Sequence, residues 1–199
     1  RLGASALMQG LADGYFVLPY TIGDYLADEI RTGPISTDLP EFEQAEQHVK
    51  QTIDKLIKSS GEIPVDDFHR RLGLIMWEYC GMSRNAKGLN KAIGMIQKLR
   101  TEFYDSVCVP GDAKDFNPEL EKAYRVADFL ELGELMCIDA LNREESCGGH
   151  FREESQTDEG EALRDDENYT YVSAWEYNGD PSNALLHKEH LEYENIEVK

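Results

Sequence analysis

The middle of this 199-residue chain is dominated by apolar residues that recur at helical spacing. Four such stripes follow one another between residues 36 and 142, separated by short segments rich in Gly, Pro or Ser. A stripe that repeats every three or four residues buries one face of a helix, so successive stripes joined by short turns favour an antiparallel bundle. The stripes are Phe42, Ala45, Val49, Ile53, Leu56, Ile57; Phe68, Leu72, Ile75, Met76, Tyr79; Ala86, Leu89, Ile93, Ile96, Leu99, Phe103; and Leu120, Tyr124, Ala127, Leu130, Leu135, Ile138, Leu141.

Local signals mark where these helices begin. The run Asn117-Pro118-Glu119 combines a capping residue, a proline for the first turn and an acid near the helix start. It predicts that the longest helix of the chain follows. Ser83 is expected to cap the start of the helix that carries Ala86 to Phe103. Trp77 is expected in the core of the bundle.

The two ends of the chain have a different character. Ser5 is expected to cap a short helix that is interrupted at Asp13, and Pro19 to prevent a regular continuation. Residues 143–168 are acidic and predict a long polar excursion tied down at points. Residues 169–177 alternate as in a strand, and further extended pieces are expected at 185–187 and 191–198. The predicted fold class is therefore mainly α (α+β overall), an antiparallel helical bundle with a small C-terminal β segment.

The charge balance narrows the possible partners. The chain has 20 Lys plus Arg against 39 Asp plus Glu, a formal net charge of −19. This argues against binding to nucleic-acid backbones or anionic membrane surfaces, which need clustered cations. No apolar run approaches the roughly 20 residues of a membrane helix.

The four cysteines, Cys80, Cys108, Cys137 and Cys147, are scattered along the chain without a close pair. Reduced thiols in a cytosolic compartment are expected. Cys147 and His150 have the spacing of half a zinc site, but no second pair stands nearby in the sequence, so we expect no metal site. His150 is either a general acid or base, or a packed and hydrogen-bonded side chain.

Arg1 stands beside the predicted helix start at Ser5. A helix start presents unpaired N–H groups, and a guanidinium pairs with a carboxylate through two parallel hydrogen bonds. Together they are suited to anions or electron-rich rings. The alternative is an ordinary surface loop and cap.

Two segments carry a resemblance to a known family. Residues 1–7 (RLGASAL) resemble the R-L-G-x-N-x-L segment of succinate dehydrogenase and fumarate reductase flavoprotein subunits. Residues 143–153 (REESCGGHFRE) resemble the R-x-E-S-R-G-A-H-x-R-x-D segment of the same family, with Cys147 in place of its usual Arg. The length and helical pattern between them match the region after the flavin domain. The chain is thus similar to the C-terminal fragment of such a subunit.

The resemblance implies a function for the intact parent, the flavin-dependent interconversion of succinate and fumarate. Hydride would pass between the dicarboxylate and FAD, with Arg1 binding the substrate and the backbone of Ser5, Ala6 and Leu7 contacting the flavin. Electrons would be exchanged with an iron–sulfur subunit and, through a membrane cytochrome subunit, with quinone. These partners would hold the protein in the cytoplasm, on the inner face of the cytoplasmic membrane.

The resemblance also implies how the chain is divided. Residues 1–35 would be a remnant of the FAD-binding domain, residues 36–142 the helical bundle domain, and residues 143–199 an acidic loop plus a C-terminal β tail. The Gly-rich loop G-x-G-x-x-G of a dinucleotide-binding domain does not occur in this sequence. We therefore expect no catalytic residue in the fragment, no FAD bound to it, and no activity from it alone.

Two other functions fit parts of the sequence. One is a stand-alone acidic helical module that binds a protein partner without enzyme activity. The other is an aspartate-oxidising relative within the flavoenzymes, which shares both motifs in general form.

Overall fold

The computed structural model describes residues 3–193 and residue 195, with side chains from residue 6 onward. The chain forms two compact units, Arg1–His48 and Val49–Lys199. The division between them falls within the sequence of helix α3 (Pro40–Ile57). The predicted division at residues 35 and 142 does not coincide with these units, and it stays a prediction.

The first unit is helical from Gly3 to Tyr25. Helix α1 (Gly3–Ala12) continues through a π-helical turn (Asp13–Val17) into helix α2 (Leu18–Tyr25). The predicted interruption at Asp13 is therefore wrong, as is the prediction that Pro19 prevents a regular continuation. The N–H of Leu18 reaches back five residues to the carbonyl of Asp13, which widens the turn before Pro19. A wider turn accommodates the proline ring and its missing N–H better than a regular α-helical turn does.

Apolar side chains of the first unit are exposed. Among its described side chains, from residue 6 to residue 48, none is buried. An unbroken series of exposed apolar residues is typical of a surface that packs against something else. The exposed residues between α1 and the segment after α2 are Leu7, Met8, Leu11, Tyr15, Phe16, Val17, Leu18, Tyr20, Ile22, Tyr25, Leu26 and Ile30.

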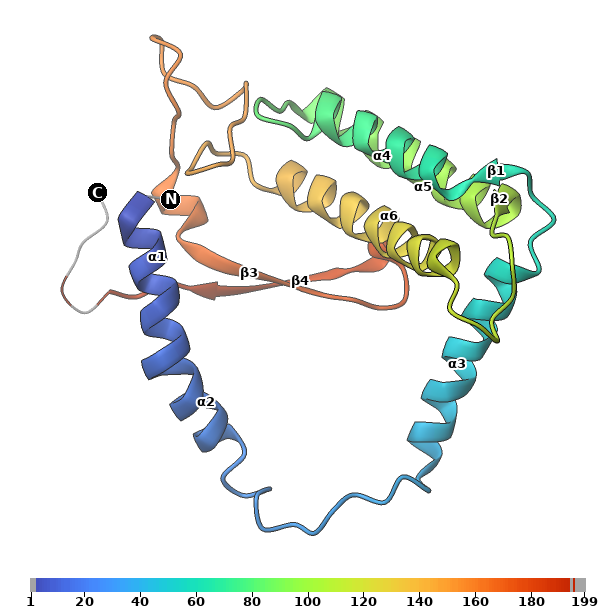
Figure 1. Ribbon diagram of the computed structural model, residues 1–199. Helices are drawn as coiled ribbons and strands as arrows, with labels where there is room; N and C mark the ends of the chain where they lie inside the picture. The colour runs from blue at the N-terminus through green and yellow to red at the C-terminus, as the bar shows by residue number, and fades with distance from the viewer. Residues whose placement is uncertain (1–2, 194, 196–199) are drawn as a thin grey trace. The chain divides into compact units, whose positions relative to one another are not determined.

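The second unit is built on three helices that lie side by side: α4 (Val65–Tyr79), α5 (Ala86–Ser106) and α6 (Pro118–Asn142) (Figure 1). The predicted mainly α helical bundle is confirmed. Asn117 caps α6 by accepting the N–H groups of Glu119 and Leu120, and α6, at 25 residues, is the longest described helix, as predicted. The cap of α5 is Asn85, two residues after the predicted Ser83.

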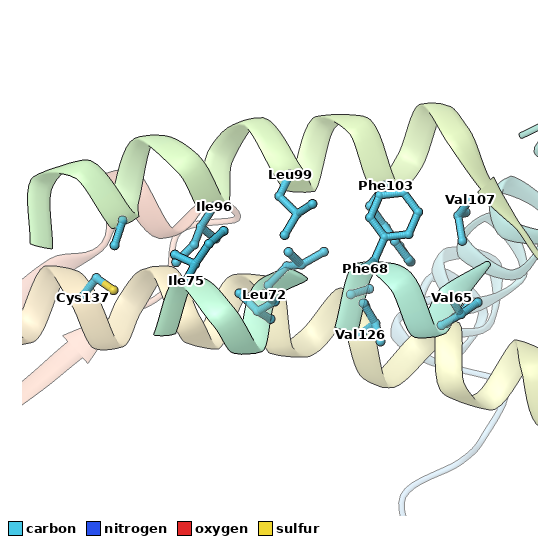
Figure 2. Packing of buried hydrophobic residues seen from close by; sticks show 14 of the residues in the cluster. Val65, Phe68, Leu72, Ile75, Ile96, Leu99, Phe103, Val107, Val126 and Cys137 are labelled. Atoms are coloured by element: carbon cyan, nitrogen blue, oxygen red, sulfur yellow. The ribbon is translucent and has the colours of Figure 1, made fainter. Parts of the chain in front are cut away.

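The core of this unit lies between the three helices (Figure 2). Phe68 and Phe103 meet edge to face, with ring centroids 5.2 Å apart, and both are fully buried. Such an arrangement adds to the free energy gained from burial alone. Most of the residues at the centre were members of the predicted stripes. The buried core residues of the helices are Leu56, Val65, Phe68, Leu72, Ile75, Leu89, Ala92, Ile96, Leu99, Phe103, Ala123, Val126, Ala127, Leu130, Cys137 and Ala140.

Two predictions about the core are wrong. Trp77 is 83% exposed, because it follows the buried Ile75 by two residues and so points to the opposite side of α4. The stripe of α3 is buried only at its end: Leu56 is buried, whereas Phe42 and Val49 are each 47% exposed. No helix in the part of the chain that the structure describes has the length and apolar character needed to cross a membrane.

Two small sheets complete the second unit. Strands β1 (Ile63–Pro64) and β2 (Val107–Cys108) form a short parallel pair that was not predicted. Strands β3 (Tyr171–Glu176) and β4 (Leu185–His190) form an antiparallel hairpin, which confirms the two predicted strands. The third predicted piece falls on residues 191–198, of which 191–193 are not a strand and most of the rest lie outside the described residues.

Hydrogen bonds and an ion pair join the hairpin to the bundle. The indole Nε1 of Trp175 donates to Asp139 at 2.7 Å, and the hydroxyl of Tyr177 donates to Glu131 at 2.9 Å. Asp180, in the connection between β3 and β4, pairs with Arg100 at 2.9 Å. The tail is therefore part of the same compact unit as the helices.

We predict that Phe103→Ala lowers the free energy of unfolding of the second unit by about 3–5 kcal/mol, because it leaves a cavity among rings that cannot close around it. Denaturant unfolding measures the change. Phe116→Ala is the matched control, since Phe116 is 87% exposed; it should alter stability by less than about 0.5 kcal/mol. Equal losses in the two variants would contradict this description of the core.

Candidate functional site

Two parts of the chain correspond to the predicted site and motif: the start of α1 and the polar segment after α6. Arg1 lies outside the described residues, as does the side chain of Ser5. Helix α1 begins at Gly3, so Ser5 lies inside the helix and is not its cap. The N–H groups at the start of a helix have no acceptor within it, and Gly3, Ala4 and Ser5 are the first three residues of α1.

The polar segment, residues 143–156, is called here the motif loop, and its centre is the buried guanidinium of Arg152. Arg152 is 3% exposed, and its Nη1 donates to the carbonyls of Ala140, Leu141 and Arg143 at 2.9, 3.1 and 3.2 Å. These carbonyls belong to the end of α6, where the helix supplies no further donors. A cation at this end also interacts favourably with the helix dipole. Arg152 therefore caps α6.

Ser146 fixes the backbone of Arg152 from both sides. Its buried hydroxyl accepts the N–H of Arg152 at 2.8 Å and donates to the carbonyl of the same residue at 3.2 Å. The Nε of Arg152 pairs with Glu154 at 3.1 Å, and Glu154 also accepts the N–H of Ala86 at 2.6 Å. One carboxylate thus connects the guanidinium that caps α6 to the first residue of α5.

The segment before α5 pairs with the motif loop along the backbone. The N–H of Arg84 donates to the carbonyl of Phe151 at 3.1 Å, and the N–H of Glu153 donates to the carbonyl of Arg84 at 2.8 Å. The carboxylate of Glu153 accepts from Ser83 at 2.8 Å and from Asn85 at 2.7 Å. The motif loop therefore closes one end of the bundle by joining the end of α6 to the start of α5.

His150 has a partner on each ring nitrogen. Its Nδ1 lies 3.0 Å from Nη1 of Arg84, and its Nε2 lies 2.8 Å from the carbonyl of Arg143. Because a guanidinium only donates and a carbonyl only accepts, Nδ1 is the acceptor and Nε2 carries the proton. Burial lowers the pKa of His150; the bond to the Arg143 carbonyl opposes this, and the charges of Arg84, Arg152 and Arg143 add to it. This geometry favours the packed, neutral histidine over a general acid or base.

Arg143 connects the motif loop to the C-terminal hairpin. It pairs with the buried Glu145 at 2.6 Å, and Glu145 also accepts the N–H of Asp165 at 2.9 Å. The Arg143 guanidinium lies 5.4 Å from the ring centroid of Tyr169 and 5.2 Å from that of Tyr171, within the range of cation–π attraction. The long polar segment predicted at residues 143–168 is thus held in place by charged residues that have little contact with solvent.

Cys147 lies in a turn within the motif loop. It exchanges two backbone hydrogen bonds with His150, at 2.9 and 3.0 Å. Gly148 adopts a φ of +58° in that turn, a conformation that favours glycine. Over the described residues, no three His, Cys, Asp or Glu side chains gather where they could hold a metal ion.

Sequence reasoning gave no role to Arg84 or to the buried pair of Glu134 and Arg100. Arg84 precedes His150 by 66 residues, and no local pattern joins them. Glu134 is fully buried, 2.9 Å from Arg100 and 2.8 Å from Gln97. The burial of Glu134 could have been predicted, because it follows the core residue Leu130 by four residues and so lies on the same buried face of α6.

We predict that Arg152→Met destabilises the second unit by about 2–4 kcal/mol, because the last carbonyls of α6 lose a charged donor inside the protein. Thermal or denaturant unfolding measures it. The control is Arg164→Met, since Arg164 pairs with Asp166 at an exposed position; its loss should be within about 1 kcal/mol. If Arg152→Met proves as mild as Arg164→Met, Arg152 is not the cap described above.

His150 should also make stability depend on pH. Because its pKa in the folded chain lies below the unfolded value of about 6.5, the unfolded chain binds more protons as the pH falls below that value. Its contribution is therefore complete above about pH 6.5 and is lost on acidification. We predict that His150→Gln shows a smaller fall in unfolding free energy between about pH 7.5 and 5.5 than the parent chain. An unchanged pH dependence would contradict a neutral, buried His150.

Comparison with known proteins identifies the family. The family model described as fumarate reductase flavoprotein C-term matches residues 69–199. A fumarate reductase flavoprotein subunit of Helicobacter pylori is 29% identical over 152 residues, 76% of this chain and 20% of the relative. A succinate dehydrogenase flavoprotein subunit of Rickettsia bellii is 27% identical over 121 residues, 61% of this chain and 20% of the relative. The chain spans about one fifth of the length of these curated relatives.

Solved structures show the same fold. A chain of E. coli quinol fumarate reductase aligns with a TM-score of 0.68 and 23% identity, covering 83% of this chain and 27% of that one. The Sdh1 complex of Mycobacterium smegmatis aligns with a TM-score of 0.66 and 21% identity, covering 84% and 27%. With the family match over residues 69–199, these likenesses agree with the resemblance of the two motifs. The chain belongs to the fumarate reductase and succinate dehydrogenase flavoprotein family, in whose C-terminal domain most of it lies.

Proposed function

We propose that this chain is the C-terminal part of a flavoprotein subunit that interconverts succinate and fumarate. The observation that carries the proposal is the family match over residues 69–199. Relatives at similar identity are named for fumarate reduction and for succinate oxidation, so the direction of the reaction is left open. Family membership argues against the alternative of a helical interaction module unrelated to enzymes.

The start of α1 is the part of the chain proposed to face the reacting groups. Arg1 would bind one carboxylate of the dicarboxylate through paired, charge-assisted hydrogen bonds. FAD, bound in the intact subunit, would supply the hydride chemistry. The residues fit such a group, because α1 begins at Gly3 and its first-turn N–H groups form a positive helix end suited to an electron-rich ring edge. Of the proposed flavin contacts, Ser5 lies within the first three residues of the helix and would offer its N–H, whereas Ala6 and Leu7 would contribute through their position at the helix start.

The exposed apolar surface of the first unit supports a place within a larger protein. Leu7, Tyr15, Phe16 and Tyr20 are each at least 70% exposed, although they lie on a continuous helical segment. We propose that residues 1–35 complete an FAD-binding domain whose remaining residues cover this surface. The chain alone would then lack most of the flavin site and would be inactive.

The intact subunit would work with partner subunits at a membrane. Electrons would pass to or from an iron–sulfur subunit and a membrane cytochrome subunit, which would hold the protein on the inner face of the cytoplasmic membrane. Solved structures with the same fold are named as complexes or as acting with quinol, which supports a multi-subunit assembly. The second unit, closed by the motif loop, would be scaffold and docking surface.

We predict that Arg1→Ala in the intact subunit raises the KM for fumarate or succinate by about 10- to 100-fold and lowers turnover. This range corresponds to the loss of about 1.5–3 kcal/mol from a charged hydrogen bond. Steady-state kinetics measures both constants, and flavin absorbance checks that FAD is retained.

Arg31→Ala is the matched control, because it removes the same charge within residues 1–35. Arg1→Lys should recover only part of the activity, since an ammonium cannot form the two parallel bonds. Kinetics unchanged in Arg1→Ala would refute the substrate contact. Assays with succinate, fumarate and aspartate on the intact subunit distinguish the proposed reaction from that of an aspartate-oxidising relative.

A further inference from the structure

An apolar pocket of about 580 Å³, called here the groove, lies between α4 and α5 in the second unit. The buried Ile75 and Leu99 form its floor, and the exposed Leu74, Trp77 and Met95 also line it. Volumes of roughly 300–1,000 Å³ with a mainly apolar lining are typical of small-molecule sites. The groove takes no part in the contacts of the motif loop or in the site proposed at the start of α1.

Side-chain bridges between the two helices close the groove at both ends. At one end Arg71 of α4 donates two hydrogen bonds to Glu102 of α5, at 2.8 and 2.5 Å. At the other end Lys91 of α5 donates to the hydroxyl of Tyr79 on α4 at 2.7 Å. Along α4 the two bridges are about 12 Å apart, at 1.5 Å per residue. A groove bounded in this way fits one elongated small molecule better than a helix of a protein partner, which would continue past both ends.

One cation in the groove has no partner. Among the residues that the structure describes, no carboxylate lies within ion-pair distance of Lys98. Lys98 precedes Glu102 by four residues on α5, so it lines the groove toward the end that Arg71 closes. The charge of Glu102 is already matched there by Arg71. This end of the groove is therefore suited to an anionic group.

The remaining charge in the lining belongs to Glu78, toward the opposite end. Glu78 follows Leu74 by four residues on α4 and stands next to Tyr79. It also lines a separate polar pocket together with Lys87 and Lys91, so two cations share its surroundings. An anion at Lys98 would thus be separated from Glu78 by the apolar part of the groove.

We propose that the groove binds a straight-chain aliphatic carboxylate as the free anion. Its carboxylate pairs with Lys98, and its alkyl chain lies over Ile75 and Leu99 toward Trp77 and Met95. Each methylene group removed from water adds to the affinity. A phospholipid in a membrane offers the same chemistry, but the formal net charge of −19 opposes the approach of this chain to an anionic membrane surface. The proposal does not depend on the proposed function.

The test is a fluorescence titration of the 199-residue chain with decanoate that carries bromine on its terminal carbon. Bromine quenches tryptophan emission at contact, and Trp77 lines the groove. We expect saturable quenching with one ligand per chain. In Trp77→Phe, where only Trp175 emits, the quenching should be lost.

Exposed positions supply variants that should fold, which circular dichroism checks. Leu74→Glu places a carboxylate in the path of the alkyl chain and should weaken binding of decanoate about tenfold or more. Lys98→Ala should weaken it about 5- to 10-fold, and Lys98→Arg should bind much as the parent does. Lys87→Ala is the matched control, because it removes the same charge from α5 outside the groove. Decanol, which has no charge, should bind equally to the parent and to Lys98→Ala.

Several results would overturn the proposal. One is quenching that does not saturate, or that persists in Trp77→Phe. Another is decanoate binding that is unchanged in both Leu74→Glu and Lys98→Ala, because the ligand would then lie elsewhere, such as on the exposed apolar surface of the first unit. Phosphatidylcholine vesicles that contain phosphatidylglycerol should not sediment with the chain. Co-sedimentation that Leu74→Glu abolishes would assign the groove to membrane lipid instead of a free carboxylate.

Discussion

The structure at the C-terminal end of α6 depends on the hydrogen bonds of the buried Arg152 guanidinium. It takes the last carbonyls of α6 as acceptors, and its own backbone is held by Ser146. Moving a charged group from water into the protein costs free energy unless its hydrogen-bonding groups find partners there. The end of a helix meets this condition, because its carbonyls are unpaired and carry partial negative charge. The motif loop is thereby held in one conformation although it contains little regular structure.

The neighbouring charges extend the same arrangement. Arg84 contacts His150, Arg143 contacts Glu145, and Arg100 contacts Glu134, so several of the chain's relatively few cations act inside the fold. The chain has a formal net charge of −19. With these arginines engaged inside the fold, the surface is strongly acidic, and arginine side chains join the segments of the interior. His150 fits among these cations only as a neutral ring, which explains both its proton position and the direction of its pKa shift.

The three bundle helices could be predicted from the sequence, because helical periodicity and capping are local properties. The cap at Asn117, the long α6 and the C-terminal hairpin were all predicted from short patterns. Trp77 was assigned to the core because it is aromatic, although its place in the helical repeat puts it outside. The π-helical turn before Pro19 was missed because the usual effect of proline is to end a helix.

Contacts between distant segments could not be predicted in this way. The bond from Arg84 to His150 joins residues 66 apart, and the contact of Met76 with Cys137 joins residues 61 apart. At the start of α1, the sequence indicated a helix beginning near an arginine, and the roles of Arg1, Ser5, Ala6 and Leu7 remain proposals. Their partners would lie on a part of the protein that this chain does not contain.

Native-state hydrogen exchange tests most directly whether the motif loop is an integral part of the bundle. The N–H of Ser146 donates to Leu163, and that of Arg152 donates to Ser146. If the loop is closed by Arg152, both amides should exchange with free energies within about 1 kcal/mol of those at the centre of α6, because they open only with the whole unit. Exchange of the loop amides by a local opening several kcal/mol less costly would contradict it.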